Sequence, residues 1–298
     1  MPNPPIAVGP ESAPGWVREA VEAGGATIVP VDRAEALVWN DPHDVAALER
    51  TLGQGPNLRW VQLPWAGVEH FAGAGIFGNG LTWTSGKGVY AEPVAEHALM
   101  LALALMRDIP ERVTATRWGA QSGRSLYDAN VTILGGGGIA TSLQQLLEPF
   151  RTTNTIIRRS GPTTLDHLDT ALARADVVVL ALALTPTTTG VIAAPQLERM
   201  PDHAVLVNVA RGRHVVTDDL VHALRDNRIH GAGLDVTDPE PLPDGHPLWT
   251  ESRCIITPHS ADTAEMIRPL LSRRITENVT RFAKGDDLIG PVDPTLGY

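Results

Sequence analysis

The chain has little of several features that would mark particular classes of protein. Its one cysteine, Cys254, cannot form an internal disulfide, which favours a reducing, cytoplasmic setting. The longest apolar runs, 98–106 and 177–184, are much shorter than the roughly 18 residues that cross a bilayer. The proline-rich start lacks the basic and apolar regions of a signal peptide. These features exclude a disulfide-stapled or membrane-spanning protein.

Positive charge is also scarce. The chain has 24 Lys and Arg against 34 Asp and Glu, which gives a net charge of −10. Such a charge disfavours nucleic acid and anionic membranes as main partners, although a few local cations can still hold a small anion. No histidine pair has metal-ligand spacing together with a third ligand, so we expect no metal site.

What the chain does contain is two successive alternations of short strands and helices. The 298 residues suffice for about two domains of roughly 150 residues each. The expected strands are 6–9, 26–31, 37–39, 58–63 and 81–83 in the first alternation, and 131–134, 155–157, 177–182, 204–209, 231–236 and 254–257 in the second. Between them, a helix that begins near Glu92 is apolar on nearly every face and is expected to be buried. Near-continuous apolar strands of this kind are typical of parallel sheets covered on both faces.

A glycine turn joins the first strand of the second alternation to a helix expected at 141–150. Gly135 allows the tight turn, Gly137 allows a close backbone approach to a pyrophosphate, and the small Ala140 allows close packing of helix on strand. Four consecutive glycines could instead form a flexible loop. With a strand before and a helix after them, they favour a dinucleotide-binding turn.

The residues that follow the next expected strand bear on the choice of nucleotide. NAD sites usually have an Asp or Glu about 20 residues past the glycines, but here that position is held by Arg158, Arg159 and Ser160. Two cations and a hydroxyl can bind a 2′-phosphate, so the sequence favours NADP, with NAD possible. The alternative is that both arginines are solvated charges at a strand end.

Three chemically useful side chains follow later strands of the same expected sheet. They are Arg211, Glu240 and His259. Ligands of open parallel sheets bind beyond the carboxyl ends of the strands, so these groups should meet. An arginine can hold a 2-oxo acid, a histidine can protonate its carbonyl oxygen, and a glutamate beside the histidine would raise its pKa. Taken singly, Arg211 could be a surface cation and Glu240 a loop acid.

The other histidines fit this pattern less well. We expect His97, on the apolar helix, to be a core residue with its hydrogen bonds satisfied. Four further histidines lie in polar stretches: His203, His214, His222 and His230.

Over nearly its whole length, 6–298, the chain resembles the D-isomer-specific 2-hydroxyacid dehydrogenase family. The matching stretches are 66–68, 94–96, 137–140, 184–186 with Thr189, 208–212, 233–236, 240–243, 246–249 and 257–259. The resemblance implies an α/β fold of two doubly wound parallel-sheet domains with a cleft between them. A flavodoxin-like substrate (catalytic) domain would comprise 1–92 plus 264–298, and a Rossmann NAD(P)-binding domain 93–263. Members are commonly homodimers through the cofactor domain.

The resemblance also implies roles for single residues. Arg211 would bind substrate, Glu240 and His259 would form the acid pair, and Asp235 would lie near the nicotinamide carboxamide. Further residues would lie beside the cofactor: Gly138, Ile139, Thr185, Pro186 and Ala210.

On the substrate side, main-chain N–H groups around Ala66 and Gly67 would hold the substrate carboxylate. Trp65 stands before them where a small residue is common, which should narrow the pocket. Together with the arginines and with Trp39 near an early strand end, this is similar to the glyoxylate/hydroxypyruvate reductases of the family.

The sequence therefore predicts an NADPH-dependent reductase of a small 2-oxo acid, with His259 as proton donor. The alternative is a dinucleotide-sensing, non-enzymatic binding protein on the same fold. Both would take a small-molecule ligand rather than nucleic acid or membrane.

Overall fold

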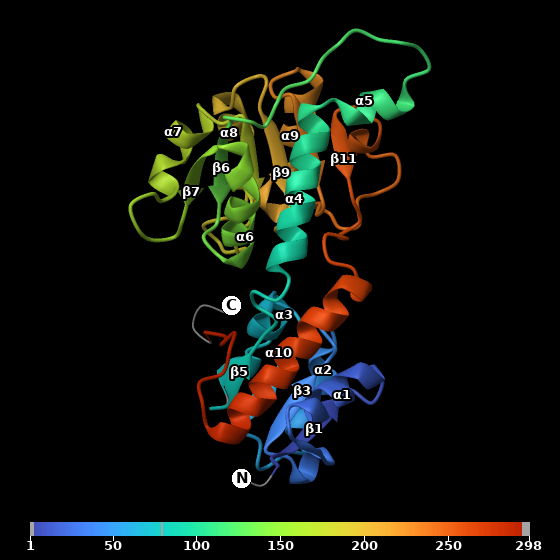
Figure 1. The fold of residues 1–298 in the computed structure, drawn as a ribbon, viewed down its shortest axis with the longest axis vertical. Coiled ribbons are helices and arrows are strands. Elements are labelled where there is room, and N and C mark those ends of the chain that lie inside the picture. Colours follow the sequence, from blue (N-terminus) through green and yellow to red (C-terminus); the bar gives the residue numbers. More distant parts are fainter. Residues whose placement is uncertain (1–2, 79, 294–298) are drawn as a thin grey trace. The chain divides into compact units, whose positions relative to one another are not determined.

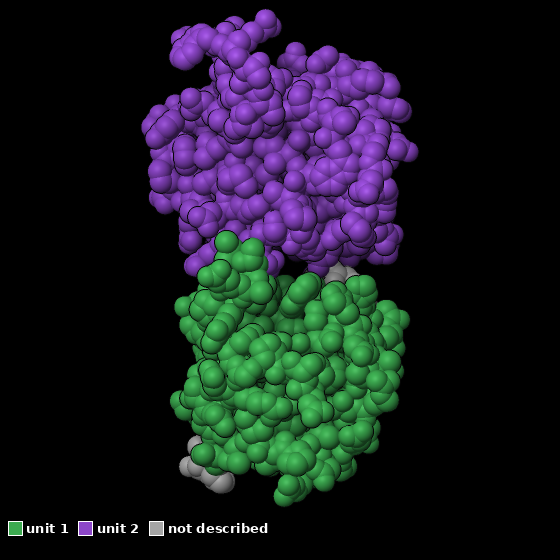
Figure 2. Space-filling model, turned by 90° about the vertical axis from the view of Figure 1, so that its right-hand side faces the viewer, with its two compact units in different colours: residues 1–90, 263–298 green, residues 91–262 purple. Residues whose placement is uncertain are grey.

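The computed structural model describes residues 3–78 and 80–293 and contains two compact units (Figures 1 and 2). Unit 1 comprises residues 1–90 and 263–298, and unit 2 comprises residues 91–262. The ends of the predicted first domain, 1–2 and 294–298, lie outside the described residues. Which unit binds substrate and which binds cofactor stays a prediction.

Unit 1 is built on a parallel five-stranded sheet with the strand order β2-β1-β3-β4-β5. Its strands are β1 (Pro5–Gly9), β2 (Thr27–Ile28), β3 (Ala36–Trp39), β4 (Trp60–Gln62) and β5 (Thr82–Thr84). Its helices are α1 (Gly15–Ala23), α2 (Val45–Leu52), α3 (Glu69–Gly73) and α10 (Ala264–Lys284). One core forms between α1, α10 and one face of the sheet, and another lies on the opposite face with α2 and α3 (Figure 1).

Unit 2 is built on a parallel six-stranded sheet with the order β11-β10-β9-β8-β6-β7. Its strands are β6 (Asn130–Leu134), β7 (Thr153–Ile157), β8 (Val177–Leu180), β9 (Val205–Asn208), β10 (Gly231–Leu234) and β11 (Cys254–Ile256). Its helices are α4 (Ala91–Met106), α5 (Ile109–Thr114), α6 (Gly138–Leu147), α7 (Leu168–Leu172), α8 (Ala194–Arg199) and α9 (Thr217–Arg225). Helices α4 and α6 pack together on one face, and α7, α8 and α9 cover the other.

Short 3-10 helices complete the two units. They are Val31–Arg33, Ile76–Gly78, Glu148–Phe150, Leu165–His167, Gly212–His214 and Pro247–Trp249.

The burial of the strands explains why both sheets are parallel. Every residue of β3, β8, β9 and β10 is buried, as expected for strands covered by helices on both faces. The predicted α/β class with two doubly wound parallel sheets is confirmed. In unit 1, β1 lies between β2 and β3, and in unit 2, β6 lies between β7 and β8. Each sheet is therefore wound in both directions, and the direction changes beside β1 and beside β6.

Helix α4 agrees with the prediction from its apolar sequence, since eight of its residues are buried. In the part of the chain that the structure describes, neither α4 nor any other helix combines the length and apolarity that crossing a membrane requires.

Several predicted strands differ from those observed by one to three residues at their ends, and two predicted elements differ in ways that have a clear cause. The strand expected at 26–31 is the two-residue β2, because the chain turns away from the sheet at Val29 and Pro30. The helix expected at 141–150 begins at Gly138 and ends at Leu147. It begins within the glycine turn, and it gives way to a 3-10 turn because Pro149 has no N–H to continue the helical ladder.

His214 lies in a polar stretch of the sequence, but it is buried in the structure. Its ring is wholly buried, with Nδ1 3.0 Å from the carbonyl oxygen of Thr188 and Nε2 3.2 Å from that of Leu182. These carbonyl groups come from a segment far away in the sequence, so local polarity could not reveal the burial.

Candidate active site

The glycine turn at the carboxyl end of β6 has the geometry of a phosphate cradle. Gly135 has φ +124°, and a Cβ there would lie 2.0 Å from the carbonyl oxygen of Ala181. Only glycine fits this position. A Cβ on Gly137 would meet no atom within 4 Å, so the backbone faces open space directly before α6. The turn therefore fits a dinucleotide, whose pyrophosphate would approach Gly137 and the first N–H groups of α6, where Ile139 also lies.

Arg158 lies over this turn. A Cβ on Gly136 would come within 2.9 Å of the Arg158 side chain, so the aliphatic stem of Arg158 packs across the glycines. Arg158, Arg159 and Ser160 are all exposed just beyond β7. The structure thus brings a cation, predicted from sequence, beside the turn that would hold the phosphates.

The loop after β9 presents Arg211. Asn208 is wholly buried, donates from Nδ2 to the Arg211 carbonyl oxygen at 2.9 Å and accepts from the Ala210 N–H at 3.1 Å. A Cβ on Gly212 would lie 1.8 Å from the carbonyl oxygen of Thr237, which shows how closely the loops after β9 and β10 pack. The Arg211 Nη1 donates to the carbonyl oxygen of Ala210 at 2.7 Å. Asn208 is therefore a positioning residue for Arg211.

His259 and Glu240 form the pair that the sequence predicts. Nδ1 of His259 is 2.7 Å from Oε1 of Glu240, and the side chains are 40% and 42% exposed. The contact on Nδ1 leaves Nε2 free to face a substrate. His259 has φ +50°, a left-handed conformation that is uncommon outside glycine. Glu240 thus orients an imidazole that solvent and small ligands can reach.

Asp235 holds the turn that carries His259. The carboxylate is 2% exposed and accepts hydrogen bonds from Thr257 Oγ1 at 2.6 Å, the Ser260 N–H at 2.9 Å and the Ala261 N–H at 3.1 Å. The Asp235 carbonyl oxygen accepts from the His259 N–H at 2.9 Å. Although burial alone would raise the pKa of this carboxyl, hydrogen bonding with His97 and with these three donors holds it below the ordinary value. The predicted place of Asp235 beside the nicotinamide carboxamide stays a prediction.

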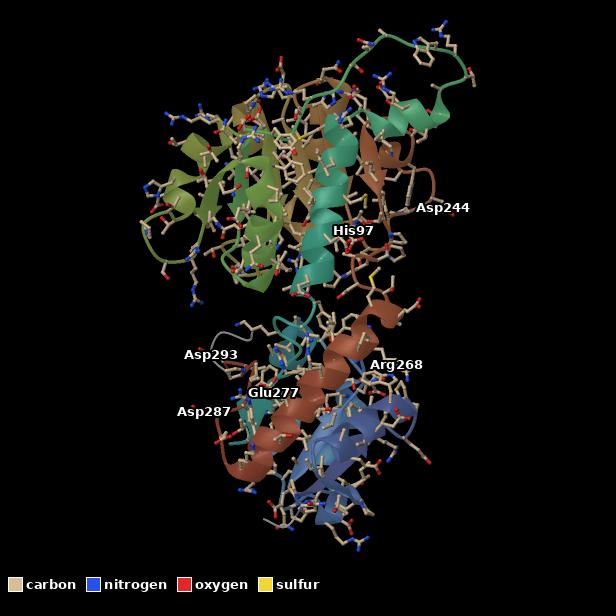
Figure 3. The ribbon with its side chains drawn as sticks, in the orientation of Figure 1. His97, Asp244, Arg268, Glu277, Asp287 and Asp293 are labelled. Carbon is tan, nitrogen blue, oxygen red and sulfur yellow. The ribbon has the colours of Figure 1, made fainter. Side chains whose placement is uncertain are left out.

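His97 belongs to the same network. It comes from α4 (Figure 3), and its Nε2 lies 2.9 Å from Thr257 Oγ1 and 3.4 Å from Asp235 Oδ1. The expectation of a hydrogen-bonded, largely buried histidine describes its surroundings correctly. What the sequence did not reveal is that its partners support the His259 turn.

A second carboxyl near the pair, Asp262, was not predicted. Burial raises its pKa, the nearby negative charge of Asp235 acts in the same direction, and the positive charges of His259 and Arg211 act against it. An aspartate after the proline–histidine pair carries no motif of its own, so sequence alone could not single it out.

In unit 1, the predicted substrate residues Trp65, Ala66 and Gly67 lie in the loop after β4, separated from its end by two residues. The Trp65 side chain is 41% exposed. The ring of His43 stands edge-on to Trp65 at 5.5 Å and to His70 at 6.1 Å between centroids.

These two histidines were not predicted as site residues. The His43 turn is fixed by Asp41, whose Oδ1 accepts from the N–H of His43 at 2.8 Å, a bond that lowers the pKa of Asp41. The two imidazoles meet only through the fold, because His43 lies in the turn before α2 and His70 lies in α3.

The remaining predicted cofactor residues lie at the carboxyl edge of the unit 2 sheet. Thr185 and Pro186 follow β8, and the Thr185 N–H donates to Thr188 Oγ1 at 2.8 Å. Ala210 follows β9. Across residues 3–78 and 80–293 there is no group of three or more His, Cys, Asp or Glu side chains that could hold a metal ion.

Comparison with known proteins agrees with this arrangement. Residues 98–261 match the family model of the D-isomer specific 2-hydroxyacid dehydrogenase, NAD binding domain. The chain is 38% identical to an uncharacterized protein in the proB 3′ region of Corynebacterium melassecola, across 81% of this chain and 84% of that protein. It is 30% identical to the glyoxylate reductase/hydroxypyruvate reductase of Mus musculus, across 78% of this chain and 76% of that protein.

A solved structure is similar over the full length. It is a D-isomer specific 2-hydroxyacid dehydrogenase from Xanthobacter autotrophicus Py2 in complex with NADPH and MES. The TM-score is 0.86 at 26% identity, with 99% of this chain and all of that chain covered. The resemblance seen in the sequence is thereby confirmed, and this chain belongs to the D-isomer specific 2-hydroxyacid dehydrogenase family of NAD(P)-dependent oxidoreductases.

Proposed function

We propose that the protein reduces a small 2-oxo acid, of the glyoxylate or hydroxypyruvate type, to a D-2-hydroxy acid with NADPH. The observation that carries this proposal is the 2.7 Å contact between His259 Nδ1 and Glu240 Oε1 at the sheet edge that also presents Arg211. An oriented imidazole and a fixed cation are what the reduction of a charged carbonyl compound requires.

Each residue has one task in this mechanism. NADPH, when bound, supplies the hydride to the carbonyl carbon. Arg211 binds the 2-oxo acid and stabilises the negative charge that develops on the carbonyl oxygen. His259 gives the proton on Nε2 to that oxygen, and Glu240 stabilises the imidazolium through Nδ1. Asp235 keeps the His259 turn in place.

The preference for NADPH rests on Arg158. Its stem packs on the glycine turn, and no ion pair occupies its guanidinium among the described residues, so it can reach a 2′-phosphate. The similar Xanthobacter enzyme is in complex with NADPH, which agrees with this choice.

A short substrate fits the residues around Ala66 and Gly67. If main-chain N–H groups there hold the substrate carboxylate, the adjoining Trp65 and His43 rings limit the space for its carbon chain. The similarity to glyoxylate/hydroxypyruvate reductases of mouse and human supports the same substrate class.

We also propose that the protein is a homodimer and acts in the cytoplasm. The exposed apolar side chains on and after α5 support the homodimer, since Val113 is 74% and Trp118 99% exposed. The cytoplasmic location rests on the single cysteine.

The decisive test is His259→Gln, assayed with a panel of 2-oxo acids by the loss of NADPH absorbance. Turnover of glyoxylate or hydroxypyruvate should fall roughly 10²- to 10⁴-fold, the usual contribution of general acid catalysis. NADPH affinity, measured by fluorescence, should stay unchanged. His222→Gln, on the exposed face of α9, is the matched control and should retain full activity.

Two outcomes would contradict the proposal. Turnover at the wild-type rate in the His259→Gln variant would show that His259 is not the proton donor. Tight NADPH binding without turnover of any 2-oxo acid by the wild-type protein would identify it as a dinucleotide-sensing binding protein.

A further inference from the structure

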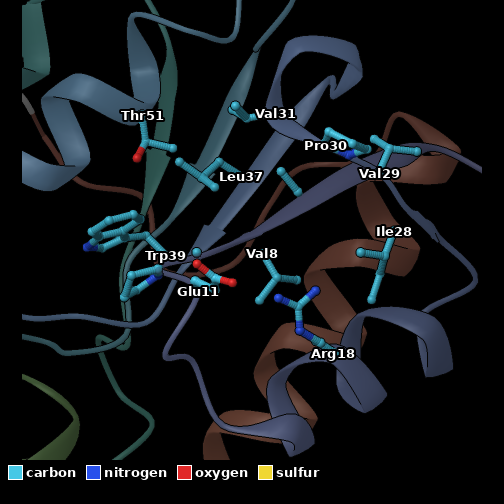
Figure 4. Close-up of a pocket in the computed structure, with 13 residues that line it drawn as sticks. Val8, Glu11, Arg18, Ile28, Val29, Pro30, Val31, Leu37, Trp39 and Thr51 are labelled. Carbon is cyan, nitrogen blue, oxygen red and sulfur yellow. The ribbon is translucent and has the colours of Figure 1, made fainter.

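Unit 1 contains a hollow of about 440 Å³ that the proposed reaction does not use. It lies at the carboxyl end of β1 and is lined by residues of β1, β2, β3, α1 and α2 (Figure 4). None of Trp65, Ala66 and Gly67 belongs to its lining. Its volume falls within the range of about 300–1,000 Å³ that is usual for small-molecule sites.

The short strand β2 creates the hollow. Pairing between β1 and β2 ends at Ile6 and Ile28, whereas β1 continues alongside β3 as far as Gly9. After Ile28 the chain turns away through Val29 and Pro30, so no strand covers this side of the end of β1.

The hollow also lies where the winding of the sheet reverses. In the order β2-β1-β3-β4-β5 the connection from β1 runs toward β2 and the connection from β3 runs toward β4, so the two diverge between β1 and β3. Open parallel sheets bind ligands at such points, because diverging loops leave a crevice there. In unit 2 the equivalent position, after β6, is the glycine turn.

The walls of the hollow combine an apolar surface with two opposite charges. Val8, Ile28 and Leu37 supply aliphatic surface, while the Glu11 carboxylate and the Arg18 guanidinium extend toward Val8 (Figure 4). Arg18 is half-buried and Glu11 is exposed. Among the described residues, neither side chain makes an ion pair or a hydrogen bond.

We propose that the hollow binds an α-amino acid with an aliphatic side chain. Arg18 binds the carboxylate of the zwitterion, Glu11 binds its ammonium group, and the side chain packs against Val8, Ile28 and Leu37. A ligand with a single charge satisfies one of these two groups and is repelled by the other. A zwitterion matches both, and its aliphatic part covers the apolar wall.

The test is calorimetric titration of the full chain with L-leucine, 4-methylpentanoate and 3-methylbutylamine. These probes share the isobutyl side chain and differ in the charged groups that they carry. Leucine should bind, and each of the singly charged compounds should bind roughly 10-fold more weakly or worse. Arg18→Gln and Glu11→Gln should each weaken the binding of leucine by a similar factor, because each substitution removes one charge-assisted contact.

The matched controls are Arg33→Gln and Glu22→Gln, which change the same charges outside the lining and should leave leucine binding unaltered. Circular dichroism checks that each variant is folded. Absence of leucine binding at millimolar concentration, or equal weakening by the control variants, would overturn the proposal. Loss of leucine binding in Arg211→Gln would overturn it as well, since the ligand would then occupy the catalytic residues. No readout depends on turnover, so the result is independent of the proposed reduction.

Discussion

At the scale of single residues, the direction of one hydrogen bond assigns the proton on His97. Thr257 Oγ1 donates its only hydrogen to Asp235 Oδ1 at 2.6 Å, so it can only accept from His97 Nε2 at 2.9 Å. The hydrogen of the imidazole is therefore on Nε2. His97 thus stabilises the Thr257–Asp235 contact, which holds the turn of His259.

Replacing His97 should lower turnover without removing a group that contacts substrate. In His97→Ala the Thr257–Asp235 pair loses a donor, and we expect kcat to fall roughly 10-fold, the effect of one hydrogen bond to a charged network. His97→Gln keeps an amide donor and should retain more activity than the alanine variant. Steady-state kinetics with glyoxylate and NADPH measures both.

His203→Ala provides a matched control for that comparison. His203 Nε2 likewise contacts a carboxylate, Asp176 Oδ1 at 3.0 Å, but Asp176 precedes β8 at the amino edge of the sheet. This variant should alter thermal stability while leaving kcat unchanged. If it lowered kcat as much as His97→Ala, or if the Gln and Ala variants of His97 were equally slow, His97 would be no more than a structural residue.

The raised pKa of Asp262 predicts that the stability of the protein depends on pH. Burial raises its folded pKa above the unfolded value, so the folded protein binds this proton more tightly than the unfolded chain does. Its contribution to stability is fully present below the unfolded pKa of about 3.9 and is lost as pH rises through the raised folded pKa. Asp262→Asn should therefore raise the free energy of unfolding near neutral pH and lose this advantage below about pH 4.

Urea denaturation at several pH values measures this difference. Asp244→Asn, on an exposed loop, is the control and should give no pH-dependent gain. An Asp262→Asn variant that is less stable than wild type at pH 7 would show that the charges of His259 and Arg211 outweigh the burial of the carboxyl.

At the scale of elements, the sequence predicted where most strands and helices lie, because buried parallel strands produce apolar runs. It overestimated the length of β2, since 26–31 is apolar except for Thr27, but only Thr27 and Ile28 pair with β1. Apolarity reports burial, whereas pairing depends on where the chain turns. The same limit concealed the hollow beside β1, the contact of His43 with Trp65, and the burial of His214, all of which require loops distant in sequence.

The β6–α6 turn and the end of β7 act together in choosing the nucleotide. Arg158 rests on Gly136, so its guanidinium is presented near the phosphate cradle. If Arg158 and Arg159 bind the 2′-phosphate, each contact should contribute about 1.5–3 kcal/mol, or roughly 10-fold to more than 100-fold in NADPH affinity. The double change Arg158→Asp with Arg159→Ala should weaken the binding of NADPH sharply. It should also improve the binding of NADH, because the new carboxylate can accept hydrogen bonds from the ribose hydroxyls.

The comparison of kcat/KM for the two cofactors, before and after the change, measures this preference. Arg174→Ala with Arg199→Ala, two exposed arginines on the same unit, is the control and should leave it unaltered. A wild-type enzyme that already prefers NADH would show that the two arginines are solvated charges.

At the scale of the whole molecule, the segment after α5 stands out from unit 2 (Figure 1). Its base is fixed: Asp108 Oδ1 contacts His230 Nε2 at 2.8 Å, Arg112 donates to the carbonyl oxygen of Ala120 at 3.1 Å, and the Arg124 N–H donates to the Met106 carbonyl oxygen at 2.6 Å. This well-held base therefore carries a segment with an apolar side chain, Trp118, that is 99% exposed.

Trp118 and Val113 should be buried in a homodimer. Exposed apolar side chains on a projecting segment usually mark an interface, and tryptophan is among the residues that contribute most to binding. Trp118→Ser with Val113→Ser should weaken the dimer roughly 10-fold or more, as measured by sedimentation velocity over a range of concentrations. Trp249→Ser removes another exposed indole, at the end of the 3-10 helix before β11, and should leave the assembly unchanged. A wild-type protein that sediments as a monomer, or a double variant that remains as dimeric as wild type, would show that this segment has another partner or none.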